Sequence, residues 1–219
     1  MLIAAIADLH GNKPALDAVM DDMPAVDQVV CAGDVVGYNP WPAACIDFLR
    51  DGEIPTVQGN HDRAVAHSSG FKFNSMAQAG VTYATKTLSE TDQQWLATLP
   101  ERMTAVNETV HIVHGHPDDP NRYTYPEDFH EGLLQGSSLL VLGHTHVQYH
   151  EVYEDGIVLN PGSVGQPRDG DHRAAYSLVD LDTLTVEERR VSYDIDVVCE
   201  KIAEVGLPQR LCERLRVGS

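Results

Sequence analysis

Positive charge is scarce in this sequence, and lysine is the scarcest source of it. The 219 residues include 15 lysines and arginines against 33 aspartates and glutamates, for a formal net charge of −18. The only lysines are Lys13, Lys72, Lys86 and Lys201, so most of the cations are arginines. A surface field of this sign repels nucleic-acid phosphates, and the sequence has no basic stripe to offset it. The composition therefore argues against stable binding to nucleic acid.

Cysteines and long apolar runs are few as well. Cys31, Cys45, Cys199 and Cys212 form no C-x-x-C pair, and we expect all four to be buried thiols in a reducing compartment. No apolar stretch reaches the length of a membrane span, and the N-terminus lacks the basic region of a secretory signal. These absences predict a cytoplasmic protein that binds no membrane. With 42% hydrophobic residues, we expect a single domain over residues 1–219.

The sequence does contain a series of short apolar runs, each of which ends in a polar turn. The runs cover residues 2–7, 28–32, 54–58, 110–113 and 139–142. Continuous apolar runs of this length are typical of strands that are covered on both faces. Caps and spacing predict helices over residues 12–22, 42–50, 75–87 and 91–99. This alternation predicts an α/β fold with a largely parallel sheet.

The last third of the chain has a different pattern. Residues 148–165 predict a hairpin that turns at "EDG", and residues 174–193 predict another strand pair around Asp182. Two helices are expected after Asp194, with a break at residues 206–208. These helices could pack against a second copy, and the sequence leaves the oligomeric state open.

Side chains that can bind metal ions follow all five apolar runs. They form D-x-H (Asp8, His10), G-D (Asp34), G-N-H-D (Asn60, His61, Asp62), H-G-H (His114, His116) and G-H-T-H (His144, His146). Ligands of α/β sheets bind at the carboxyl ends of strands, so strand pairing can gather these turns on one edge. Each motif alone is weak evidence, because an aspartate after a glycine is usually a turn residue or a helix cap.

The five motifs in this order resemble those of the calcineurin-like metallophosphoesterase superfamily. The resemblance covers residues 2–165, and "GDVVGYNP" and "LNPGSVGQPRDGD" resemble its small prokaryotic phosphodiesterase branch. It implies a four-layer αββα fold, in which a central β-sandwich of mixed sheets is flanked by helices. It also implies two divalent ions. The implied ligands are Asp8, His10 and His146 for one ion and Asn60, His114 and His144 for the other, with Asp34 shared by both.

The resemblance further implies a metal-bridging hydroxide as the nucleophile and His61 as the general acid. Two ions about 3.5–4 Å apart can lower the pKa of a shared water and bind phosphate oxygens. Asp62 could orient His61, or it could cap a helix. Oxygen and imidazole ligands without a thiolate suit Mn²⁺, Fe, Ni²⁺, Co²⁺ or Zn²⁺, and we expect manganese to support activity. Only Asp8 and Asp34 would bring negative charge, so the loaded site would attract an anionic phosphoester.

We therefore expect a hydrolase of phosphodiesters or nucleotide-like phosphoesters. The alternatives are a phosphomonoesterase, a hydrolase of dinucleoside polyphosphates, or a non-catalytic scaffold like the retromer subunit that has this fold. A protein phosphatase is disfavoured, because Gly37 stands where that branch carries the second aspartate of G-D-x-x-D-R-G. The expected substrate contacts are Tyr38, Asn39, His116, Ser163 and Arg168, each of which could instead be a turn residue.

An acidic, lysine-poor surface resembles that of proteins from a high-salt cytoplasm. If this protein is halophilic, its unfolding temperature rises steadily as KCl is raised from dilute buffer to molar concentrations, because salt screens the repulsion among the carboxylates. Thermal unfolding followed by circular dichroism tests this expectation. Full stability in dilute buffer would count against a halophilic origin.

Overall fold

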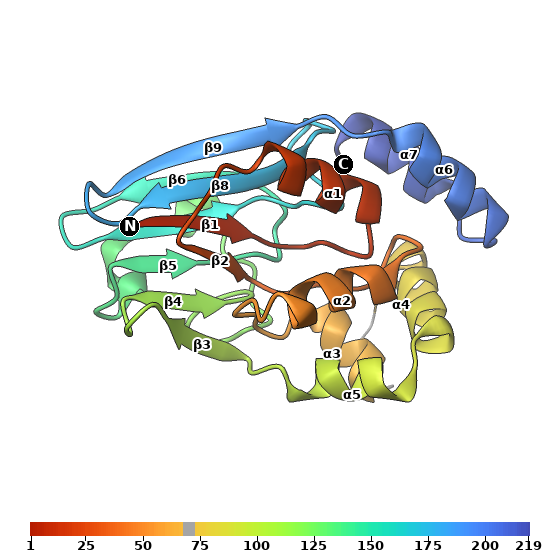
Figure 1. Cartoon of the computed structure of the whole chain (residues 1–219), viewed down its shortest axis with the longest axis horizontal. Helices are drawn as coiled ribbons and strands as arrows, with labels where there is room; N and C mark the ends of the chain where they lie inside the picture. The colour runs from red at the N-terminus through yellow and green to blue at the C-terminus, as the bar shows by residue number, and fades with distance from the viewer. Residues whose placement is uncertain (68–72) are drawn as a thin grey trace.

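Two mixed β-sheets form the centre of the computed structural model, which describes residues 1–67 and 73–219 (Figure 1). The first sheet has the order β2-β1-β8-β9 and consists of β1 (Leu2–Ile6), β2 (Gln28–Cys31), β8 (Ala174–Asp180) and β9 (Thr185–Val191). The second has the order β3-β4-β5-β7-β6 and consists of β3 (Arg102–Ala105), β4 (Val110–Val113), β5 (Leu139–Val141), β6 (Gln148–Val152) and β7 (Ile157–Pro161).

Parallel pairing is confined to part of each sheet. β1 pairs in parallel with β2, and β5 lies in parallel between β4 and β7. The remaining pairs are antiparallel, including the predicted hairpins β6–β7 and β8–β9. Two mixed sheets flanked by helices confirm the predicted fold class, whereas the expectation of one largely parallel sheet was too simple.

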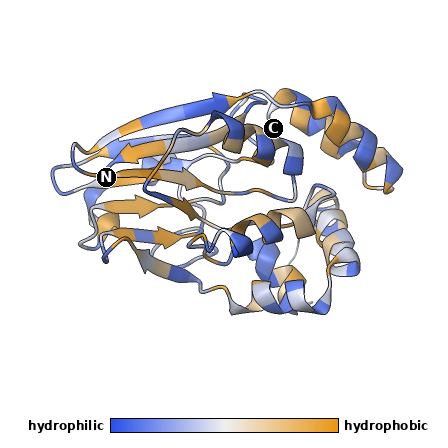
Figure 2. Cartoon of the chain, in the orientation of Figure 1, coloured by the Kyte–Doolittle hydropathy of each residue, from blue (hydrophilic) through white to orange (hydrophobic). Residues whose placement is uncertain are grey.

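The two sheets pack face to face over a shared apolar core. Ile3 and Ala5 of β1 belong to the same buried cluster as Ile112, Val141 and Leu159 of the second sheet. The alternate β1 residues, Ala4 and Ile6, face the opposite way and belong to a cluster with residues of the helices. Period-two alternation thus buries both faces of β1, which is why its sequence is continuously apolar. Figure 2 shows the contrast between the hydrophobic β1 and β5 and the largely hydrophilic β9.

The predicted helices are present with small shifts at their ends. They are α1 (Lys13–Asp22), α2 (Pro42–Asp51), α4 (Ser75–Thr87) and α5 (Glu90–Thr98), followed near the C-terminus by α6 (Ile195–Glu204) and α7 (Arg210–Val217). Side-chain caps fix four of the starts: Asn12 for α1, Asn74 for α4, Ser89 for α5 and Asp194 for α6. On the outer face of the second sheet, Leu133 and Leu134 of the 3₁₀ turn η2 (Glu131–Leu134) pack with Leu140 and Val158.

Two elements differ from the sequence predictions. Residues 54–58 were expected to form a strand, but they make only one isolated parallel bridge, between Cys31 and Thr56. Pro55 has no N–H to donate to a ladder, although its carbonyl oxygen accepts a hydrogen bond from Cys31 N. The segment that follows forms α3 (Asn60–His67), which we did not predict because its first turn is polar and carries the G-N-H-D motif.

The expectation that all four cysteines are free was wrong for two of them. Cys199 of α6 and Cys212 of α7 form a disulfide, with their Cα atoms 5.1 Å apart, whereas Cys31 and Cys45 are buried and free. The turn between the two helices brings these cysteines together, and their spacing in the sequence does not reveal it. Among the described residues, no helix is long and apolar enough to cross a membrane.

The disulfide closes a short loop, so its removal raises the entropy of the unfolded chain. We expect the Cys199→Ser/Cys212→Ser variant to lose about 3 kcal/mol of unfolding free energy in a denaturant titration. Alkylation of the unfolded wild-type protein without reductant should modify only Cys31 and Cys45, as measured by mass spectrometry. Modification of four cysteines under these conditions would show that the bond is absent.

Candidate metal centre

The carboxyl ends of β1, β2, β4 and β5 point to the same side of the molecule, where α2–α5 also lie (Figure 1). Each strand leads into a turn that carries polar side chains. Asp8 and His10 follow β1, Asp34 follows β2, His114 follows β4, and His144 and His146 follow β5, all at most 5% exposed. Asn60, the remaining predicted ligand, is the first residue of α3. The structure thus brings all of the predicted metal ligands to one location, where all except the partly exposed Asn60 are buried.

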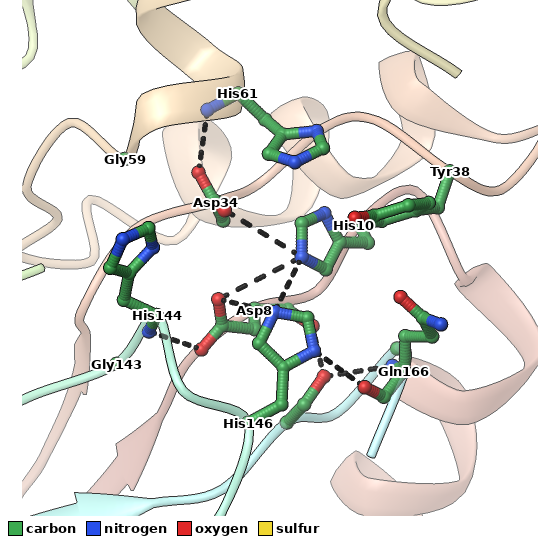
Figure 3. A network of polar contacts seen from close by, with 12 residues as sticks. Asp8, His10, Asp34, Tyr38, Gly59, His61, Gly143, His144, His146 and Gln166 are labelled. Atoms are coloured by element: carbon green, nitrogen blue, oxygen red, sulfur yellow. Dashed lines mark hydrogen bonds and ion pairs between the residues drawn. The ribbon is translucent and has the colours of Figure 1, made fainter. Parts of the chain in front are cut away.

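The backbone of these turns is left-handed at residues other than glycine. The φ angles are 53° at Asp8, 48° at His10, 51° at Asp34, 69° at His144 and 59° at His146. Such angles are uncommon for residues with a Cβ, and each costs on the order of 1 kcal/mol. These left-handed angles explain how His144 and His146 of "GHTH" can point in different directions. A regular strand would have directed both imidazoles to the same face. In this turn the two rings diverge, and each joins a different group of side chains (Figure 3).

The first group surrounds His10 and His146. Their Nε2 atoms are 3.1 Å apart, and Asp8 Oδ1 lies 3.2 Å from His146 Nε2 and 3.7 Å from His10 Nε2. Asp34 Oδ2 is 3.6 Å from His10 Nε2. The other carboxylate oxygen of Asp8 accepts a hydrogen bond from His144 N, while Asp8 Oδ1 has no hydrogen-bond partner among the described residues.

The second group surrounds His114. Its Nε2 atom is 3.1 Å from His144 Nδ1, 3.2 Å from Asn60 Oδ1 and 3.4 Å from Asp34 Oδ2. The Oδ2 atom of Asp34 is therefore close to both groups. This carboxylate is held by its other oxygen, which accepts a hydrogen bond of 2.8 Å from His61 N.

The remaining ring nitrogens fix which atoms face the centre. His10 Nδ1, His114 Nδ1 and His146 Nδ1 lie 3.0, 2.8 and 2.5 Å from the carbonyl oxygens of Val36, Ala32 and Gln166, and His144 Nε2 lies 3.2 Å from that of Asn121. A carbonyl oxygen only accepts, so each of these nitrogens carries the proton. In the neutral rings, the inner nitrogens then face one another with lone pairs. Such an arrangement requires positive charge, and it suits a divalent cation bound by imidazole and carboxylate groups.

Electrostatics agrees with a site that attracts cations. Burial lowers the pKa of His10 and His146 well below the usual range and that of His144 to about 3, so these rings are neutral. Burial opposes protonation of His114 too, but the adjacent Asp34 carboxylate raises its pKa to about 9, so without a metal ion this ring carries a second proton on Nε2, which a bound cation would displace. The pKa of Asp34 is well below its ordinary value, because the nearby imidazoles outweigh burial. Asp34 is therefore ionised where both groups meet.

His61 lies at the edge of the cluster with an imidazole that is nearly unpartnered. Its ring centre is 4.7 Å from those of His10 and Tyr38, and its buried Nδ1 has no hydrogen-bond partner among the described residues. Burial lowers its pKa to about 4. Gly37 packs against this nitrogen, since a Cβ at Gly37 would overlap it. Gly37, which stands at the position of the second aspartate of the phosphatase motif, thus leaves room for the His61 ring.

Asp62 does not contact the His61 ring. Its carboxylate accepts hydrogen bonds from Gly59 N at 2.9 Å and from Val36 N at 3.1 Å, and burial raises its pKa to about 7. These bonds tie the turn before α3 to the turn after β2. The helix-cap alternative for Asp62 describes this arrangement better than a direct role in orienting His61.

A pocket of about 230 Å³ opens over the cluster. Of the expected substrate contacts, Tyr38 and Arg168 line it, whereas three others do not. Ser163 donates to Asp8 O and accepts from Gln166 N, Asn39 donates to Gly165 O, and His116 Nδ1 accepts from Asp118 N within its own loop.

Several residues that line the pocket were missed from the sequence, among them Tyr123 and Arg214. Tyr123 stacks on His144, with ring centres 3.8 Å apart and planes at 13°, and Arg214 reaches the pocket from α7. Tyr123 lies in a polar loop without periodicity, and Arg214 lies beyond the motifs, so neither had a local signal.

Comparisons with known proteins agree with this geometry. The model of a calcineurin-like phosphoesterase superfamily domain matches residues 1–184. An uncharacterized protein of Methanocaldococcus jannaschii is 32% identical over 99% of this chain and 98% of its own, and the phosphodiesterase YfcE of Escherichia coli is 27% identical over 85% and 91%. The crystal structure of a metallophosphoesterase from Sphaerobacter thermophilus has a TM-score of 0.85 and 32% identity, and it covers 100% of this chain and 99% of that one.

Close packing at Gly59 gives a test of the cluster. A Cβ at this position would overlap the carboxylate and the backbone nitrogen of Asp34. We expect Gly59→Ala to lower the unfolding temperature by roughly 5 °C, because overpacking displaces the turn. It should also abolish the rise in unfolding temperature that Mn²⁺ produces by binding the native state.

The control is Gly170→Ala, where φ is +85° and a Cβ meets nothing within 4 Å. This variant bears backbone strain without any overlap at the cluster, so it should keep the full response to Mn²⁺. An undiminished response in Gly59→Ala would contradict the placement of Asp34.

Proposed function

We propose that this chain, which belongs to the calcineurin-like phosphoesterase superfamily, hydrolyses phosphodiesters or nucleotide-like phosphoesters with the help of two divalent ions. The observation that carries the proposal is the pair of inner imidazole contacts, His10–His146 and His114–His144, on either side of Asp34. Lone pairs that face one another in a buried site are stable only with positive charge between them. The family supplies the reaction class.

One ion would be held by Asp8, His10 and His146 and the other by Asn60, His114 and His144, with Asp34 shared. The distances among these atoms support the division, because Asp34 Oδ2 lies 3.6 Å from His10 Nε2 and 3.4 Å from His114 Nε2. When bound, such ions neutralise phosphate charge and lower the pKa of water. A donor set of imidazole and oxygen without thiolate favours Mn²⁺, with Fe, Ni²⁺, Co²⁺ and Zn²⁺ as alternatives.

His61 is the proposed general acid. Its ring lines the pocket beside Asp34, where a ring nitrogen would donate to a leaving oxygen. Burial disfavours the imidazolium, but an anionic phosphoester bound beside the ring favours it. Asp62 would act on His61 indirectly. By binding Gly59 N and Val36 N it positions the backbone from which His61 extends.

The likeness to an E. coli phosphodiesterase supports the diester as the substrate over the two alternatives, a phosphomonoester and a dinucleoside polyphosphate. Presence of His61 and of every proposed ligand favours catalysis over the scaffold alternative, in which we would expect some of these residues to be lost. Cytoplasmic location and the absence of nucleic-acid binding stay predictions from composition.

Two substitutions separate metal binding from proton transfer. Asp34→Asn should lose bound metal and activity together, because among the described residues Asp34 is the carboxylate that belongs to both groups. His61→Ala should retain the metal and lose about 100-fold or more in turnover, the usual effect of deleting a general acid. Metal content by mass spectrometry and hydrolysis of bis(p-nitrophenyl) phosphate with Mn²⁺ measure the two effects.

His150→Ala is the matched control. This histidine lies on β6, pairs with Glu188 and is remote from the predicted ligands, so both readouts should equal those of the wild type. Equal turnover in wild type and His61→Ala would refute the acid role. Tight metal binding by the wild type without hydrolysis of any ester would favour the scaffold.

A further inference from the structure

We infer that Arg168 and Arg214 form a second anion site next to the metal centre, and that the substrates are phosphoesters with a second phosphate group on the same sugar or nucleoside. The inference rests on the proposed function for the phosphate that is cleaved. It adds a binding site for a phosphate that is not cleaved.

The two arginines line one pocket together with Tyr38. Arg168 donates to the Tyr38 hydroxyl from NH2 at 3.0 Å, and its Cζ atom lies 5.7 Å from the centre of the Tyr38 ring. The Arg214 side chain, which extends from α7, lines the same pocket, and burial and the charge of Arg168 are among the causes that lower the pKa of Arg214. Both arginines line the pocket that also contains Asp34 and His61.

Tyr38 contacts the proposed metal ligand His10 through its ring and Arg168 through its hydroxyl. Its ring centre is 4.7 Å from that of His10, with the planes nearly perpendicular (Figure 3), and its hydroxyl accepts a hydrogen bond from Arg168. A phosphate at the arginines would therefore lie about one tyrosine ring away from a phosphate beside Asp34. Two phosphates on one sugar span such a gap, whereas the oxygens of a single phosphate do not.

Neither guanidinium is neutralised by a side chain. Among the described residues, no aspartate or glutamate oxygen lies within 4.0 Å of Arg168 or Arg214, although arginines such as Arg50 and Arg190 have acidic partners. Although the chain has 33 acidic side chains, none of those described is paired with these two arginines, and Arg214 has only the Ser219 oxygen at its Nε. The buried Nε of Arg168 has no hydrogen-bond partner among the described residues. Guanidinium groups bind phosphate through paired N–H donors, so phosphate is the anion that fits.

The C-terminal helices hold Arg214 in place. Leu211 and Leu215, on the same helix, belong to one buried cluster with Tyr38, and Cys212 is bonded to Cys199 of α6. Arg214 Nε donates to Ser219 O at 2.5 Å, which leaves the terminal nitrogens for an anion. This part of the chain lies outside the matched family domain, residues 1–184. The second anion site thus combines a family-domain arginine with one from the C-terminal helices.

The test compares two chromogenic substrates with the same leaving group: the 5′-(p-nitrophenyl phosphate) of thymidine, and the same ester with a 3′-phosphate. With Mn²⁺ present, wild-type protein should prefer the 3′-phosphorylated ester in kcat/KM by about 10-fold, the value of one charged hydrogen-bonding contact. Arg214→Met should remove most of this preference, chiefly through KM. Arg216→Met, which removes an exposed arginine of α7 that pairs with Asp196, should keep it.

Calorimetric titration of the Mn²⁺-loaded protein gives a readout that does not depend on turnover. Thymidine 3′,5′-bisphosphate should bind more tightly than thymidine 5′-phosphate, and Arg214→Met should abolish the difference. If Arg214→Met unfolds, Arg168→Met replaces it in both assays.

The outcomes separate this inference from the proposed function. If neither ester is hydrolysed but the bisphosphate preference in binding depends on Arg214, the function fails and the anion site stands. If both esters are hydrolysed and the wild type shows no preference, or Arg214→Met keeps it, the second anion site is refuted. An equal loss on both esters would mean that Arg214 contacts the cleaved phosphate, which also overturns the inference.

Discussion

The architecture of the site depends on one interaction, the contact between ring nitrogens whose lone pairs face one another in the interior. Each imidazole is oriented by a backbone carbonyl behind it, such as Val36 O for His10 and Ala32 O for His114. These carbonyl oxygens belong to the neighbouring turns. The packing of the strand ends therefore fixes the orientations of the rings. Without positive charge this arrangement is repulsive. A proton on His114 offsets the repulsion in one pair, and a bound cation would offset it in either pair. Asp34, ionised and close to both groups, supplies the negative charge that makes the binding of two cations compatible with burial.

Left-handed turns are the means by which the fold builds this contact. Asp8, His10 and Asp34 all have positive φ, and hydrogen bonds from Asp8 N to Gly33 O and from His10 N to Asp34 O join the first two turns. The fold tolerates the strain of several such residues because the strands that carry them are buried on both faces, and this burial stabilises them. The core between the sheets and the core under the helices fix β1 from both sides, so the strained turns have little freedom to relax.

Local sequence predicted the parts of the molecule that local interactions determine. The strand ends, the capped helices and the gathering of the metal-ligand turns followed from apolar runs that stop at D-x-H, G-D or G-H-T-H. Features that depend on distant partners did not follow. Asp62 binds backbone from the turn after β2, the disulfide depends on the angle between α6 and α7, and Arg214 is adjacent to Tyr38 only after the chain has folded. The ligand roles, the single domain and the native metal stay predictions, because geometry without the ions cannot assign them.

The whole protein is negatively charged, whereas Arg168 and Arg214 give its pocket positive charge. The ionic strength determines which of the two fields dominates the approach of an anionic substrate. At low salt the field of a surface with −18 extends beyond the pocket and repels an anionic ester before it arrives. At about 1 M salt the screening length falls to about 3 Å, so the distant carboxylates no longer contribute. Contacts inside the pocket, such as those of Arg168, are short and partly buried, and they are screened much less. An acidic surface is therefore compatible with binding of polyanionic substrates if the protein works in concentrated salt, where only the cationic pocket is felt.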